Sequence, residues 1–149
     1  MKKMICFFVV IVLLLSLVMT KQDDFNFLSN CSKILAVSDE KLADENYVLQ
    51  NGKQYYYFYN DIDKLKDKGF SAYNFYFDIA TDLSQILDCF SFVYEGEGVD
   101  DYKIYYGYYD GYRDFRYVDG KKINVQVVKN DYEIIVGFPL IVTGYYLLR

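Results

Sequence analysis

The stretch FSAYNFYFDIATDLSQILDCF, residues 70–90, places a strand pattern directly before a helix pattern. Its first part alternates, with Tyr73, Phe75 and Phe77 on one face, as is typical of a half-buried strand. Its second part, residues 81–90, has apolar residues at helical spacing behind a capping aspartate. A strand followed by a helix favours an α+β fold.

Upstream of this stretch the sequence predicts three short elements. Residues 33–37 have the composition of a strand, and residues 47–60 predict a hairpin whose turn consists of Asn51 and Gly52, both at positive φ. Residues 61–69 predict a second short helix, with an aspartate at its start and a glycine in the left-handed conformation at its end.

Downstream, strand patterns predominate. Residues 91–95 predict a strand, and from residue 102 onward the chain has only strand and turn patterns, with Asp119 and Gly120 as a second two-residue turn. We therefore expect one α+β domain over residues 33–149, built from an antiparallel sheet with two packed helices and a C-terminal β meander.

The N-terminus has the pattern of an export segment. Two lysines precede the apolar run of residues 4–19, and polar sequence follows at once. The run lies between the length of a signal peptide, about 7–15 apolar residues, and that of a membrane span, about 18 or more. We expect residues 1–20 to be a signal peptide or a signal anchor, and residues 21–32 to be a polar spacer. Both alternatives place the body outside the cytoplasm.

Composition excludes several classes of function. The chain carries a net charge of −5, which makes nucleic acid a poor partner. It has no histidine, so histidine-based triads and zinc sites are excluded. We expect no metal and no cofactor, and a non-enzymatic protein. The enzymatic alternative is a carboxylate-dependent hydrolase of envelope polymers that uses Asp110 and Asp114. The acids of residues 95–101 are interpreted as a solvated loop rather than a calcium site.

Two cysteines, Cys31 and Cys89, follow the export segment. In an oxidising compartment they could form a disulfide, which would stabilise the fold by roughly 4 kcal/mol in the chain-entropy model. Two partly buried free thiols are the alternative.

A tyrosine-rich stretch, DYKIYYGYYDGYRDFRY, occupies residues 101–117. A strand over residues 102–109 would place tyrosines on both of its faces, which favours a structural role in a sheet. The alternative is a surface that binds a cell-wall glycan or a peptide. Its candidate binding residues are Tyr105, Tyr106, Tyr108, Tyr109, Tyr112 and Arg113.

The stretch VDGKKINVQVVKNDYEIIVGFPLIVTGYY, residues 118–146, resembles the C-terminal part of the YwmB-like family of small exported bacterial proteins. The positions that carry the resemblance include Asn124, Gln126, Gly137, Pro139 and Gly144. The resemblance implies an exported α+β protein and no established activity. We interpret Asn124 and Gln126 as facing water on a half-exposed sheet, and binding to a ligand is the alternative.

These patterns together indicate an exported, envelope-associated and non-enzymatic binding or structural module. Its partner would be an unknown envelope component or protein, and it would contact the membrane through residues 4–19 if that segment stays uncleaved. A further alternative is a helper of another envelope protein that docks by an exposed sheet edge.

Overall fold

The structure is a computed structural model that describes residues 25–66, 68–96 and 102–141. The expected export segment, residues 1–20, and Gly144 lie outside the described residues. Within the described part of the chain, no helix is long and apolar enough to cross a membrane.

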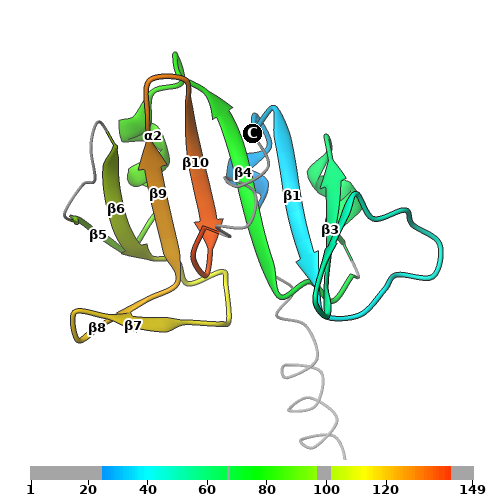
Figure 1. Ribbon diagram of the computed structural model, residues 1–149. Coiled ribbons are helices and arrows are strands. Elements are labelled where there is room, and N and C mark those ends of the chain that lie inside the picture. The colour runs from blue at the N-terminus through cyan, green and yellow to red at the C-terminus, as the bar shows by residue number, and fades with distance from the viewer. Residues whose placement is uncertain (1–24, 67, 97–101, 142–149) are drawn as a thin grey trace, which may run out of the picture.

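An eight-stranded antiparallel sheet forms the body of the molecule (Figure 1). Its strands follow the spatial order β2-β3-β1-β4-β10-β9-β6-β5. They are β1 (Lys33–Ser38), β2 (Leu49–Asn51), β3 (Gln54–Tyr59), β4 (Ala72–Asp78), β5 (Phe92–Glu95), β6 (Lys103–Tyr108), β9 (Val125–Lys129) and β10 (Glu133–Phe138). The strands β7 (Arg116–Val118) and β8 (Lys121–Ile123) form a separate hairpin between β6 and β9.

The expected α+β fold with two packed helices is wrong. Of the described residues, 44% lie in strands and 11% in helices, which makes this part of the chain β-rich. Residues 61–69 hold only the 3-10 turn η2 (Ile62–Leu65), and residues 81–90 hold the five-residue helix α2 (Leu83–Leu87). A third turn, η1 (Asn26–Leu28), precedes β1.

The helices are short because the chain has to enter strands soon after each of them. The predicted N-cap of α2 is present, since the Asp82 carboxylate accepts the Ser84 N–H at 3.0 Å. The helix nevertheless ends at Leu87, and β5 begins at Phe92. So short a helix is not stable by itself and depends on packing against the sheet.

The core lies on one face of the sheet, which we call the core face. The alternation predicted for β4 is confirmed, because Tyr73, Phe75 and Phe77 are buried on the core face while Tyr76 packs on the opposite, outer face. Side chains from η1, α2 and the loop after β6 cover the core face; these include Leu28, Ile86 and Tyr112. The outer face has its own smaller apolar cluster, formed by Leu35, Val37, Tyr56, Tyr76, Val128, Ile135 and Ile141.

The two predicted hairpin turns differ in outcome. Asp119 and Gly120 both have positive φ, 51° and 74°, so the turn between β7 and β8 is confirmed. Asn51 instead stays in β2, paired with Gln54, and the turn consists of Gly52 and the residue after it. Among the described residues the positive-φ glycines are Gly52 and Gly120, so the predicted left-handed glycine at 69 is wrong.

Candidate functional site

Four aromatic side chains line the outer face of the edge strand β5 and its neighbour β6. The register places Phe92 opposite Tyr108 and Tyr94 opposite Tyr106. The rings of Phe92 and Tyr108 are nearly parallel, at an interplanar angle of 8° and a centroid distance of 6.2 Å. The rings of Tyr94 and Tyr106 lie 5.6 Å apart. Such cross-strand pairs stabilise a sheet edge by about 0.2–1 kcal/mol each. We call these four residues the aromatic row.

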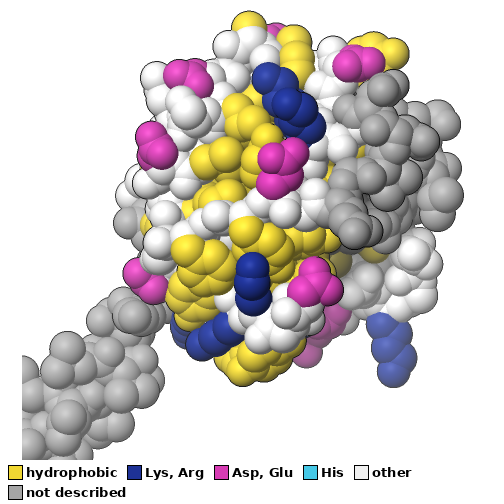
Figure 2. Space-filling model, turned by 90° about the vertical axis from the view of Figure 1, so that its left-hand side faces the viewer, with side chains coloured by type: hydrophobic (Ala, Val, Ile, Leu, Met, Phe, Trp, Pro, Cys, Tyr) yellow, Lys and Arg dark blue, Asp and Glu magenta, His cyan; other side chains and the backbone are white. Residues whose placement is uncertain are grey.

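The hairpin β7–β8 brings lysines onto these rings. The ammonium of Lys121 lies 3.9 Å from the ring centroid of Tyr94. The ammonium of Lys122 lies 4.2 Å from the centroid of Phe115 and 5.2 Å from that of Tyr108. Figure 2 shows hydrophobic side chains, tyrosine included, gathered on this side of the molecule with basic side chains among them. Partial burial and the nearby Asp119 carboxylate, in that order, raise the pKa of Tyr94.

The strand β5 is also the last strand on its side of the sheet. The Gly96 N–H donates to the Ile104 carbonyl at 2.8 Å. Because antiparallel pairing alternates, Phe92 and Tyr94 direct their backbone groups toward β6. Val93 and Glu95 direct theirs to the opposite side, where no other strand pairs with β5 in the part of the chain that the structure describes.

The structure does not bring the six predicted binding residues together on one surface. The alternation along β6 is confirmed: Tyr105 packs against the core, and Tyr106 belongs to the aromatic row. Tyr109 also packs against the core, and Tyr112 is 3% exposed within it. Of the six, Tyr106 and Tyr108 lie on the outer face, and Arg113 is exposed in the loop after β6.

Asn124 holds the loop that follows β6. Its side chain is fully buried, so the interpretation that it faces water is wrong. The Oδ1 atom accepts the Tyr109 N–H at 2.7 Å, and the Nδ2 atom donates to the carbonyls of Tyr109 and Tyr112 at 2.7 and 2.9 Å. The amide therefore bonds the protein's own backbone and fixes the chain where β6 ends and the path to the hairpin begins.

Gln126 and Gly137 shape the end of β10 in a similar way. The Gln126 side chain is half-buried, and its Oε1 atom accepts the Ile141 N–H at 3.0 Å. Gly137 lies directly beneath Ile141, because a Cβ atom at position 137 would be 2.5 Å from the Ile141 nitrogen. The peptide bond before the buried Pro139 is cis. These positions, which carry the sequence resemblance, contact the protein's own chain.

The acidic residues considered for catalysis lie at the surface. Asp110 is exposed and accepts a hydrogen bond from the Ser91 hydroxyl at 2.9 Å, and Asp114 is exposed as well. This arrangement gives the hydrolase alternative no buried acid. Most of the acidic loop, residues 97–101, lies outside the described residues.

Both cysteines of the body are free thiols in the structure. Cys31 is half-buried, and burial raises its pKa to about 11. Cys89 is exposed, and its pKa is raised, first by partial burial and second by the Asp88 carboxylate.

The surface residues that sequence reasoning missed belong to two neighbouring strand pairs. They are Phe92, Tyr94, Phe115, Tyr117, Lys121 and Lys122. The alternation of aromatic residues in SFVYE (91–95) was a signal for the first two. The pairing of β5 with β6, which turns that alternation into the aromatic row, is a tertiary feature.

Comparison of this chain with known protein families, with curated proteins and with solved structures finds no match. The resemblance of residues 118–146 to the YwmB-like family thus stays a prediction.

Proposed function

We propose that the protein is an exported, envelope-associated and non-enzymatic module that binds an extended segment of a partner protein along β5. The observation that carries this proposal is the open edge of β5 beside the aromatic row. A partner segment would pair with the outward backbone groups of Val93 and Glu95, and its side chains would lie beside Phe92 and Tyr94. Main-chain pairing supplies affinity in this mode of recognition, and side-chain contacts supply specificity.

The composition of the edge supports this role. Proteins protect unpaired edges with lysines, proline, bulges or covering segments. Within β5 the charged side chain is Glu95, and Phe92 is 41% exposed. The described part of the spacer does not shield the edge, since Phe25 packs on the core face against Tyr73. The edge is only four residues long, so ring contacts have to contribute to binding.

The sequence supports the proposed location. The lysines and the apolar run of residues 4–19 favour export, and the acidic composition disfavours nucleic acid. A tethered or secreted body with an open sheet edge fits a helper of another envelope protein.

The proposal is tested with two substitutions at one position. Glu95→Pro removes an outward N–H that the β5–β6 ladder does not use, whereas Glu95→Ala removes the same carboxylate and keeps the N–H. The probe is a set of peptides selected from a random displayed library on the full chain. We expect the selected peptides to bind the parent and Glu95→Ala alike and to lose binding to Glu95→Pro. Equal binding to both variants would overturn the proposal.

A cell-wall glycan is the second candidate ligand, because the Phe92 ring is exposed and parallel to that of Tyr108. Its test is sedimentation with purified cell-wall sacculi. Binding that survives Glu95→Pro but is lost in Phe92→Leu, which keeps an apolar side chain without a ring, would assign the aromatic row to a glycan instead of a peptide.

A further inference from the structure

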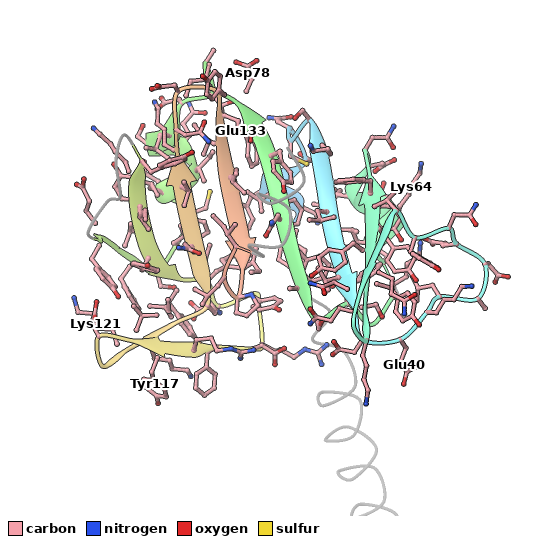
Figure 3. The ribbon with its side chains drawn as sticks, viewed as in Figure 1. Glu40, Lys64, Asp78, Tyr117, Lys121 and Glu133 are labelled. Carbon is pink, nitrogen blue, oxygen red and sulfur yellow. The ribbon has the colours of Figure 1, made fainter. Side chains whose placement is uncertain are left out.

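Phe115 and Tyr117, at the start of the β7–β8 hairpin, form a second exposed aromatic surface. Phe115 and Tyr117 are 40% and 69% exposed, and their ring centroids lie 5.7 Å apart. The register places Tyr117 and Lys122 on the same face of the hairpin. In Figure 3 the labelled Tyr117 lies on the side of the hairpin remote from the main sheet, whereas Lys121 lies toward β5. We call Phe115, Tyr117 and Lys122 the hairpin face.

The charge of this segment is opposite to that of the whole chain. Residues 113–122 contain two arginines, two lysines and two aspartates, a net charge of +2 (4 − 2), in a chain of net charge −5. Tyrosine and phenylalanine beside lysine and arginine are the side chains that occupy the interface of a bilayer. Basic side chains near a membrane surface are attracted by anionic lipid headgroups.

The length of chain before the described residues places this surface near the expected membrane anchor. Six Cα steps join Met19, the last residue of the apolar run, to Phe25, and they span at most about 20 Å. The Phe25 ring lies 6.0 Å from that of Tyr112, which is fixed by Asn124. Tyr112 in turn precedes Phe115 by three residues, at most about 11 Å. An anchor formed by residues 4–19 therefore holds the end of the sheet that carries the hairpin close to the bilayer.

We propose that the hairpin face rests on the surface of an anionic lipid bilayer, the one in which residues 4–19 are inserted. This inference relies on the proposed export with an uncleaved anchor. Tyr117 and Phe115 sit at headgroup level, and Lys122, which the register places on the same face as Tyr117, contacts lipid phosphates. The contact orients the body, with the hairpin below the sheet and β5 at its side border in Figure 1.

The test uses the full chain in vesicles of phosphatidylglycerol and phosphatidylcholine with brominated acyl chains. The chain contains no tryptophan, so one substitution supplies a single reporter. Tyr117→Trp places it on the hairpin face. Tyr132→Trp is the matched control, because Tyr132 is 79% exposed and lies in the turn between β9 and β10. Glu133, the next residue, is labelled in Figure 3 at the end of the sheet opposite the hairpin. Bromine quenches tryptophan only at short range.

We expect the tryptophan emission of the Tyr117→Trp variant to be quenched and shifted to shorter wavelength, and that of the Tyr132→Trp variant to be unchanged. Adding Lys122→Gln to the Tyr117→Trp variant should decrease the quenching. Adding Lys64→Gln, which alters an exposed lysine in η2, should not change it.

Three failures can be told apart. If the chain floats with the vesicles but the Tyr117→Trp reporter is not quenched, or the Tyr132→Trp reporter is quenched equally, the hairpin inference is overturned and the anchor stands. If the chain does not float with the vesicles, the anchor and the hairpin inference both fail. If the emission of the Tyr117→Trp reporter shifts to shorter wavelength only when sacculi are added, the hairpin face binds the cell wall and the bilayer contact is overturned.

Discussion

Asn124 replaces a peptide group opposite Tyr109. Its side-chain amide accepts the Tyr109 N–H and donates to the Tyr109 carbonyl, each at 2.7 Å. The ladder between β6 and β9 ends at the pair of Gly107 and Val125. Asn124 directly precedes Val125, and Tyr109 lies two residues after Gly107. The amide thus extends the pairing of the sheet by one step and directs β8 away from it. This side chain therefore holds the chain at the base of the hairpin, which the contacts of Lys121 with Tyr94 and of Lys122 with Tyr108 also tie to the sheet.

Replacing Asn124 with alanine should destabilise the fold strongly. Three hydrogen bonds are lost and backbone groups are left buried without them, so we expect a loss of about 2–4 kcal/mol in the free energy of unfolding. Urea unfolding measures it. Gln126→Ala removes one hydrogen bond of a half-buried side chain and should cost about 1 kcal/mol. Equal effects of the two substitutions would contradict the role assigned to Asn124.

Gly137→Ala should also be destabilising, because the new Cβ atom would collide with the backbone of Ile141. Overpacking of this kind costs about 1–3 kcal/mol. Gly69→Ala is the matched control, since Gly69 has no atom within 4 Å of a new Cβ and no positive φ. We expect that variant to be neutral or up to about 1 kcal/mol more stable. A tolerated Gly137→Ala would show that the residues around Ile141 do not pack on β10 as described.

The two thiols should react at different rates. With its pKa raised to about 11, Cys31 has about 100-fold less thiolate at pH 8 than an ordinary thiol of pKa 9, and it is half-buried. Cys89 is exposed, so iodoacetamide should label Cys89 first. Mass spectrometry of timed samples follows both sites. Protection of both thiols until a reductant is added would establish the disulfide between Cys31 and Cys89 in the exported protein.

Alkaline pH should weaken the attachment of β3 to the loop before it. The Tyr59 hydroxyl donates to Glu45, which also pairs with Lys68. Burial, and then the proximity of Tyr57, raises the pKa of Tyr59 to about 12 from 10. A raised pKa in the folded state adds stability that is fully present below pH 10 and is lost as the pH rises toward 12. Urea midpoints measured between about pH 9 and pH 11.5 should fall less steeply in Tyr59→Phe than in the parent. Identical slopes would show that Tyr59 ionises as in the unfolded chain.

The sequence predicted strands better than it predicted their arrangement. The alternation in β4 and β6 assigned the correct faces, because a period of two depends only on the local backbone. The helices were overestimated, since the apolar spacing of residues 81–90 also suits a single helical turn followed by core contacts such as those of Phe90. Local pattern does not determine how far a helix extends when a strand follows it closely.

The candidate site was predicted only in part for the same reason. Tyr106 and Tyr108 were named from the sequence, but their partners Phe92 and Tyr94 come from a strand separated from them by a loop. The burial of Tyr112 depends on its contacts with Phe25, far away in the sequence. Pairings between distant segments are determined by the whole fold, so a local sequence pattern does not predict them.

Amide hydrogen exchange along β5 tests the central claim most directly. In the free full chain we expect the amides of Phe92 and Tyr94 to be protected by pairing with β6, and those of Val93 and Glu95 to exchange rapidly. Addition of a selected peptide should protect Val93 and Glu95. If these two amides are already protected in the free protein, or stay unprotected when the peptide is bound, β5 is not an open binding edge.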